Sequence, residues 1–273
     1  MKVLGVKICT IALLLSFTSC QRENDDASNI NVTQMKEAYC DRISSPDVRM
    51  CTEIPFSKDI ADSKGLKAAL LKNKRWKTGQ TIRVKFLNGH SYLQDNVKKY
   101  ADMWLDYANL KFEYVGPNEK ADIKIAFKWD CDYSTWSYLG TDCRSIKQNQ
   151  PTMNFGWFDQ YTHDIEFQRV VLHEFGHALG LVHEHQNPLA DIQWDKEAVY
   201  SYYNNFEGWD KEKVDRNIFD KYSTNQTNYT RFDDKSIMLY AIDENFTLDK
   251  FSIDWNRELS ETDRNFISKI YPY

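Results

Sequence analysis

The sequence has little excess charge, few histidines and no internal repeat. Lys and Arg number 35 and Asp and Glu number 40, so the formal net charge is -5. This balance offers no basic surface and excludes nucleic acid as a partner. The missing repeat period excludes solenoids and propellers. Hydrophobic residues make up 42% of the 273 residues and aromatic residues 14%, so the chain can bury a substantial core in one or two domains.

The apolar run over residues 8–17 is too short to span a bilayer. Lys2 and Lys7 supply a positive end before it, and together they predict an export signal over residues 1–20. The segment Phe17-Thr18-Ser19-Cys20 resembles a bacterial lipobox, in which Cys20 carries the lipid, and ordinary signal-peptidase cleavage nearby is the alternative. We therefore expect an exported bacterial protein. It is either an outer-membrane lipoprotein, exposed at the surface or not, or a protein released outside the cell, and it contacts membrane only through Cys20.

Four of the six cysteines remain after Cys9 and Cys20 are assigned to the signal and the lipid. They are Cys40, Cys51, Cys131 and Cys143, an even number that suits an oxidising compartment. Cys131 and Cys143 bracket a loop rich in Tyr, Ser and Trp, so a disulfide between them is predicted. Cys40 and Cys51 are close enough in the sequence to form a second disulfide.

Periodic structure is expected only from about residue 75 onward. Residues 21–74 are polar and read as a tether or pro-segment, although residues 64–71 favour one short helix, and residues 75–273 form the expected catalytic domain. Alternating apolar residues predict strands, apolar residues at helical spacing predict helices, and residues 152–158 suggest an edge strand along a cleft. The predicted strands are 81–87, 111–115 and 121–129, and the predicted helices are 92–108, 168–179, 195–206 and 211–221, with a last helix capped at Ser260–Asp263.

Four of the six histidines lie within residues 173–185. On a helix, His173 and His177 project from one face and can share a metal ion. His183 would rotate to the opposite side on a continuing helix, but Gly180 can take the left-handed conformation that ends a helix and reverses the chain. The sequence therefore predicts a three-histidine site, whereas His185 is one histidine too many and is expected at the surface or behind the ligands.

Three histidines leave one coordination position open, which is typical of a catalytic zinc ion. Zinc lowers the pKa of a bound water molecule to about 7. Glu174, next to the ligand His173, would accept the proton of that water and pass it to a leaving amine. We therefore expect one Zn²⁺ per chain, bound by His173, His177 and His183, with Glu174 as the catalytic base.

The stretch from His173 to Glu184 resembles the extended zinc motif of the metzincin metalloendopeptidases, and Glu184 after the third histidine resembles the astacin branch. A second match is the segment Ser236-Ile237-Met238-Leu239-Tyr240, which resembles the metzincin methionine turn. The resemblance implies structural support from Met238 below the metal and an oxyanion-stabilising hydrogen bond from Tyr240. It also implies buried pairing of Glu184 with a mature N-terminus, but the residues after the motif differ from those of animal astacins, so Glu184 bonding to local groups is the alternative.

The implied fold is α+β, with an upper mixed sheet and two helices, a lower irregular and helical subdomain, and the active-site cleft between them. The implied activity is hydrolysis of peptide bonds in proteins by a monomer that is secreted or anchored at the surface. A matrixin-like peptidase with an idle Tyr240 is one alternative, and a non-catalytic binding module on this scaffold is another. Relatives keep their zinc blocked with a cysteine or aspartate of the pro-segment, which makes Cys40, Cys51 and Asp47 candidates for a latch.

Overall fold

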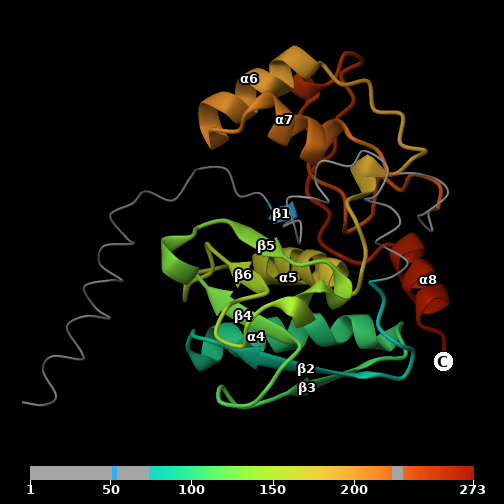
Figure 1. Ribbon diagram of the computed structural model, residues 1–273. Coiled ribbons are helices and arrows are strands. Elements are labelled where there is room, and N and C mark those ends of the chain that lie inside the picture. Colours follow the sequence, from blue (N-terminus) through green and yellow to red (C-terminus); the bar gives the residue numbers. More distant parts are fainter. Residues whose placement is uncertain (1–50, 54–73, 223–229) are drawn as a thin grey trace, which may run out of the picture. The chain divides into compact units, whose positions relative to one another are not determined.

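The computed structural model describes residues 51–53, 74–222 and 230–273. The chain divides into the units 1–43 and 44–273, and every described residue belongs to the second unit. The strands are β1 (Cys51–Glu53), β2 (Thr81–Phe86), β3 (Lys111–Tyr114), β4 (Ile123–Phe127), β5 (Thr135–Ser137) and β6 (Met153–Phe155), and the α-helices are α4 (Ser91–Ala101), α5 (Asp164–Ala178), α6 (Lys196–Glu207), α7 (Lys211–Val214) and α8 (Glu261–Ile270) (Figure 1). No helix in these ranges has both the length and the apolar character that crossing a membrane requires.

The six strands form one mixed sheet in the order β1-β5-β6-β4-β2-β3. Strand β5 is antiparallel to β6, and every other neighbouring pair is parallel. Five strands come from residues 75–273, as expected for an α+β domain. The sixth, β1, belongs to the segment that the sequence presents as a tether, and it pairs with β5 with Cys51 opposite Thr135.

The position of β6 corrects the expectation of an edge strand over residues 152–158. Strand β6 lies between β4 and β5, and all three of its residues are buried. A strand that is buried on both faces is typical of the interior of a sheet. Among residues 75–273, the strands at the sheet edges are β3 and β5, and β1 covers β5.

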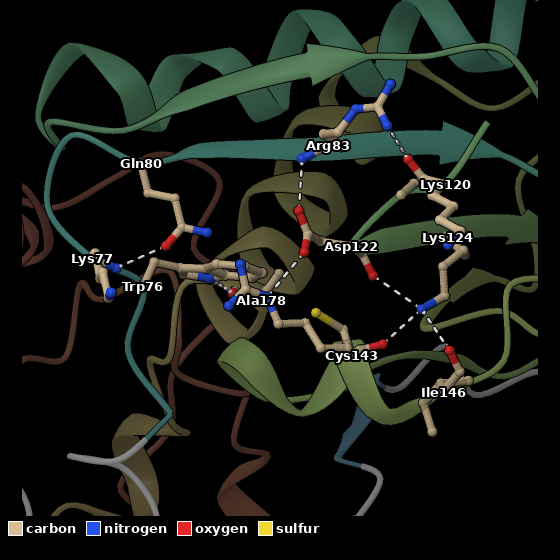
Figure 2. A network of polar contacts seen from close by, with 12 residues as sticks. Trp76, Lys77, Gln80, Arg83, Lys120, Asp122, Lys124, Cys143, Ile146 and Ala178 are labelled. Carbon is tan, nitrogen blue, oxygen red and sulfur yellow. Dashed lines mark hydrogen bonds and ion pairs between the residues drawn. The ribbon is translucent and has the colours of Figure 1, made fainter.

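Strand β4, one of the predicted strands, is buried along its whole length, polar positions included. Lys124 is fully buried, and its ammonium group donates to the carbonyl oxygens of Asp122 (3.0 Å), Cys143 (2.6 Å) and Ile146 (3.2 Å) (Figure 2). Burial lowers the pKa of Lys124 to about 8. Three carbonyl acceptors match the three donors of an ammonium group, so this polar side chain is tolerated in the sheet.

Helices α4 and α5 pack against each other beside the sheet (Figure 1). Helix α4 continues as a 3₁₀ helix, η1 (Asp102–Asp106), which together account for the helix predicted over residues 92–108. Trp104 of η1 is fully buried, and its indole Nε1 donates to the carbonyl oxygen of Leu172 in α5 at 3.0 Å. Helix α5 therefore lies deep in the core, with every residue from Arg169 to Ala178 buried.

The C-terminal half contains α6 and α7, which are separated by residues 208–210, and α8, which begins at Glu261. Helix α6 confirms the prediction over residues 195–206, whereas α7 is short and continues as a π-helical turn, η5 (Asp215–Phe219). Helix α8 begins with the predicted cap, because the Ser260 hydroxyl accepts from the Asp263 amide and the Asp263 carboxylate accepts from the Ser260 amide. The expected helix over residues 64–71 lies outside the described residues.

Candidate active site

Three buried imidazoles converge at the C-terminal end of α5. The Nε2 atom of His177 lies 3.2 Å from that of His173 and 3.0 Å from that of His183. Their ligand atoms all lie within 4.8 Å of one another. Nitrogen ligands at about 2.0–2.1 Å from a tetrahedral zinc ion are separated by about 3.3 Å, close to the two distances observed here. The structure thus brings together the three histidines that the sequence predicts as ligands.

The hydrogen bonds of the Nδ1 atoms in two of these rings leave the Nε2 atoms free to bind a cation. His173 Nδ1 lies 2.8 Å from the carbonyl oxygen of Ile237, and His177 Nδ1 lies 2.9 Å from that of Leu181. Each Nδ1 must therefore carry the proton, which leaves an unprotonated Nε2 lone pair directed toward its neighbour. Burial holds the pKa of His173 and of His183 well below the ordinary value, so the rings are neutral. Lone pairs that face one another at this distance repel unless they bind a metal ion.

Gly180 ends α5 as predicted, with φ of +98°. Its amide donates to the carbonyl oxygen of His177, and the amide of Leu181 donates to that of Gly176, the two bonds of a Schellman motif. The reversal brings the Leu181 carbonyl oxygen to His177 and returns the chain so that His183 reaches the other two rings. A left-handed residue is thus what allows a third ligand only six positions after the second.

The methionine turn lies against the same helix. A Cβ atom at Gly176 would stand 2.3 Å from Met238 Sδ, so the absence of a side chain at Gly176 lets Met238 pack directly on α5. The Met238 carbonyl oxygen accepts from the amide of Glu184, next to His183. Met238 therefore contacts the elements that carry the ligands, which is the support that the sequence resemblance implies.

Asp263 is a supporting residue that the sequence reasoning missed. Its carboxylate accepts from the Ile237 amide at 2.8 Å and from the Ser236 hydroxyl at 2.7 Å. Ile237 in turn offers its carbonyl oxygen to His173. The capping-box pattern identified Asp263 as a helix cap, but only the fold shows that it also holds the methionine turn.

Glu174 and Cys51 lie beside the first ligand. Ligand atoms of Cys51, His173 and Glu174 lie within 4.8 Å of one another, and all three residues are buried. Cys51 is a free thiol that is only 1% exposed, in the strand β1. The structure therefore places a cysteine of the 21–74 segment next to the predicted catalytic base.

Tyr240 lies over the ligand rings. Its ring centroid is 4.3 Å from that of His183 and 5.9 Å from that of His173, and its hydroxyl donates to the backbone carbonyl oxygen of Cys51. His185 is buried rather than exposed, and it stacks on Tyr240 with centroids 4.7 Å apart. His185 Nε2 lies 2.8 Å from the Asn217 carbonyl oxygen, which fixes its ring. His185 therefore belongs behind the site, supporting Tyr240.

Glu184 bonds to local groups. Its carboxylate accepts from Asn187 Nδ2 at 2.8 Å and from the Asp233 amide at 3.0 Å. Burial, the largest influence, raises the pKa of Glu184 to about 7. These contacts agree with the alternative expectation that Glu184 bonds to local groups.

The structure corrects both disulfide predictions. Cys131 is disulfide-bonded, but Cys143 is a buried free thiol, so the two are not joined to each other. Cys143 lies within the hydrophobic core, whereas Cys131 lies in a tight turn with φ of +65°. Cys51 is also free, which excludes the Cys40–Cys51 disulfide. Cys20, Cys40 and Asp47 lie outside the described residues.

An open cleft of about 650 Å³ begins at Tyr240. Its walls come from α6, from the segment after the methionine turn and from residues 252–255. Aromatic and acidic side chains share this lining: Tyr202, Tyr203, Tyr240, Phe246 and Trp255, with Asp243, Glu244 and Asp254. The cleft can therefore receive a side chain that has both an apolar stem and a positive charge.

The chain is similar to zinc peptidases in sequence and in structure. The family model described as Matrixin, of the M10 peptidases, matches residues 75–193. A solved structure of myroilysin is 45% identical, with a TM-score of 0.72, and the match covers 74% of this chain and 98% of that one. A crystal structure of myroilysin is 40% identical, with a TM-score of 0.62, over 84% of this chain and 93% of that one.

Two further relatives are more distant. Serralysin B of Dickeya chrysanthemi is 32% identical over 45% of this chain, and the chain spans only 27% of its length. High choriolytic enzyme 1, a hatching enzyme zinc-protease from Oryzias latipes, is 16% identical with a TM-score of 0.50 over 73% of this chain and 95% of that one, a likeness of fold alone. The matching family model is that of matrixins rather than astacins, so the astacin assignment stays a prediction. The site, the sheet and these similarities agree on one family, and the chain belongs to the metzincin class of zinc metalloendopeptidases, with a matrixin peptidase domain.

Proposed function

We propose that this protein hydrolyses peptide bonds in proteins, with Glu174 as the catalytic base and Tyr240 as the oxyanion donor. The observation that carries the proposal is the convergence of three imidazole Nε2 atoms next to a buried glutamate. A zinc ion on these imidazoles would supply a Lewis acid that polarises a carbonyl group and acidifies water. The protein residues then orient the peptide and move the proton.

Glu174 is suited to proton transfer by its position. It follows the ligand His173 on α5 and is fully buried, so a proton that it accepts stays within the site. In the proposed reaction Glu174 takes a proton from the attacking water and delivers it to the nitrogen of the leaving amine. The amide bond breaks as the new carbon–oxygen bond becomes a carboxyl group.

Tyr240 is suited to stabilise the oxyanion. Its hydroxyl already donates to a peptide carbonyl oxygen, that of Cys51, which shows that a backbone carbonyl in this place is within reach. With substrate bound, the same phenol would donate to the scissile carbonyl oxygen, whose negative charge grows in the transition state. This role is the feature of astacins that we propose the chain shares, despite its matrixin-type domain.

We further propose that the intact chain is a zymogen in which Cys51 is the latch. The strand β1 occupies the free edge of β5, where an extended peptide could otherwise add to the sheet. Cys51 lies beside His173 and Glu174, and its carbonyl oxygen accepts the hydrogen bond of the Tyr240 hydroxyl. A thiolate is a strong zinc ligand, so Cys51 would compete with water for the open position. Removal of the segment that carries β1 would open the site.

The substrate proposal follows from the cleft beside Tyr240. Aromatic walls bind the methylene stem of a lysine or arginine, and the carboxylates of Asp243 and Glu244 attract its charged end. The pKa of Tyr202 is raised by burial, then by the charge of Glu207 and then by that of Asp243. The charge of Asp243 therefore acts inside this region. We propose that a basic substrate side chain binds here.

Export through residues 1–20, lipidation of Cys20 and a location at the bacterial surface or outside the cell remain part of the proposal. They rest on the sequence of the first twenty residues. Mass measurement and N-terminal sequencing of the mature protein would test them, because a lipidated Cys20 has a defined added mass and an unmodified chain contradicts the lipoprotein proposal.

Four full-length proteins test the activity: wild type, Cys51→Ala, Cys51→Ala with Glu174→Gln, and Cys143→Ala. We expect Cys51→Ala to cleave casein faster than wild type, because the latch is gone. Cys143→Ala is the matched control, since it also removes a buried free thiol but one that is not grouped with His173 and Glu174 as Cys51 is, and it should stay as inactive as wild type. The added Glu174→Gln change should abolish cleavage while one zinc ion per chain is retained.

Three results would contradict these proposals separately. Cleavage that survives Glu174→Gln would refute the base assignment. Equal activity of wild type and Cys51→Ala would refute the latch. Full zinc content without cleavage of casein in any of the four proteins would favour the alternative of a binding module on this scaffold.

A further inference from the structure

Backbone carbonyls at the end of a helix have no partner within the helix, and at the end of α5 side chains supply the missing donors. The carbonyl oxygens of Phe175, Gly176 and His177 accept from backbone amides of residues 179–181. Within residues 51–53, 74–222 and 230–273, no backbone amide donates to the carbonyl oxygens of Ala178 and Leu179. At the end of a buried helix such groups need side chains or water as partners.

Two aromatic side chains from opposite ends of the catalytic domain supply these donors. The indole Nε1 of Trp76 donates to the Ala178 carbonyl oxygen at 2.8 Å (Figure 2), and the Tyr271 hydroxyl donates to that of Leu179 at 2.7 Å. The Tyr271 oxygen also accepts from the Trp76 amide at 3.3 Å, which joins the two donors. Trp76 is 4% exposed and Tyr271 is 0% exposed, so water does not replace these bonds easily.

We propose that Trp76 and Tyr271 are positioning residues for the third zinc ligand. The two carbonyls that they hold come directly before Gly180, where the chain reverses toward His183. The same reversal sets the Leu181 carbonyl oxygen that orients His177. Fixing Ala178 and Leu179 therefore fixes the geometry of two of the three ligands. The inference rests on the zinc site of the proposed function.

Trp76 is itself held from the sheet. The Arg144 guanidinium lies 4.8 Å from the centre of its ring, and Arg144 Nε donates to Asp122 at 2.9 Å. The same Asp122 carboxylate accepts from the Arg83 amide of β2 at 3.0 Å (Figure 2). Asp122 thus connects β2 to the residue that stacks on Trp76. The indole is oriented by this network rather than by local sequence.

This arrangement limits where the latch can be removed. The Lys74 carbonyl oxygen accepts from the Thr141 amide at 2.9 Å, and the Lys74 side chain is paired with Asp142. A cut after Trp76 would separate the indole from the domain that it supports. Activating cleavage that preserves zinc binding must therefore leave Lys74 and Trp76 attached to the domain.

The test compares Tyr271→Phe with Tyr273→Phe in the full-length protein. Tyr273 is the control, because its hydroxyl also donates to a backbone carbonyl, that of Leu105, which is not one of the two carbonyls before Gly180. Three quantities are measured: the zinc dissociation constant by chelator competition, the increase in Tm that zinc causes, and the visible spectrum of the cobalt-substituted protein. The first two are linked, because a ligand that binds only the folded state raises Tm in proportion to its affinity.

We expect Tyr271→Phe to raise the zinc dissociation constant by roughly threefold to tenfold, the size expected for one lost hydrogen bond. The zinc-induced rise in Tm should shrink and the cobalt spectrum should change, whereas Tyr273→Phe should match wild type in all three. An equal loss of Tm with and without zinc, at an unchanged dissociation constant, would overturn the inference. Should Tyr271→Phe not fold, Trp76→Phe decides by the same criteria, and a wild-type chain that binds no zinc would overturn the proposed function as well.

Discussion

Replacing Gly180 with alanine separates the conformational role of this residue from any packing role. A Cβ atom at Gly180 would meet no heavy atom within 4 Å, so no clash is introduced. The backbone φ of +98° is nevertheless unfavourable for any residue with a side chain. The cost is that of a left-handed conformation, about 1–2 kcal/mol. For a domain of this size such a change lowers the Tm of the zinc-loaded protein by about 2–8 °C.

The same strain should weaken zinc binding. Without zinc, the turn can relieve the strain by opening, but bound zinc requires the reversal that brings His183 to His173 and His177. A penalty of about 1–2 kcal/mol that falls only on the zinc-bound state raises the dissociation constant by about 5-fold to 30-fold. Chelator competition measures this constant, and thermal unfolding of the zinc-free and zinc-loaded proteins measures the stability.

Gly79→Ala is the control for this prediction. Gly79 has φ of +78° and equally open surroundings, but it lies in the turn before β2. Because the zinc-free turn can open, Gly180→Ala should lose little stability without zinc and should lose zinc affinity. Gly79→Ala should lose the same stability with and without zinc and should keep the zinc affinity of wild type. Equal zinc affinity in the two variants would refute the reasoning that the left-handed residue sets the third ligand.

Three more predictions concern the cleft, the oxyanion and the buried lysine. In the Cys51→Ala background, Tyr240→Phe should lower kcat by on the order of tenfold to a thousandfold with KM little changed, and an unchanged kcat would favour the matrixin alternative with an idle tyrosine. In the same background, Asp243→Asn should lower kcat/KM for peptides with a lysine or arginine but not for peptides with a leucine. Asn is chosen because it can still cap the short helix at residues 244–246. Asp249 lies outside the cleft, so Asp249→Asn should leave kcat/KM unchanged for both kinds of peptide. Because the folded state lowers the pKa of Lys124 to about 8, the unfolded chain binds more protons between pH 8 and about 10.5, so Lys124 contributes a free energy of unfolding that rises with pH over this window. The free energy of unfolding of wild type should therefore rise relative to that of Lys124→Met as the pH increases over that window. A difference between the two proteins that does not vary with pH would contradict the lowered pKa.

The sequence alone determined the chemistry of this protein. Histidines four apart on a helix must share a face, and a glycine must follow when a third ligand comes only six residues later, so His173, His177, His183 and Gly180 could be assigned from spacing. Alternating apolar residues located β2, and the cap at Ser260 located α8, because these patterns arise from local geometry.

The tertiary structure decided the pairings between residues far apart in the chain. Cysteine spacing suggested that Cys131 and Cys143 are joined, but the fold buries the Cys143 thiol in the core and bonds Cys131 elsewhere. Residues 152–158 read as an edge strand because the order of strands in a sheet is not written in any one strand. Nothing local to Trp76 or Tyr271 identifies Ala178 and Leu179 as their partners, about a hundred residues away. These contacts follow from which surfaces pack together when the whole chain buries its apolar side chains, and that choice is made only in three dimensions.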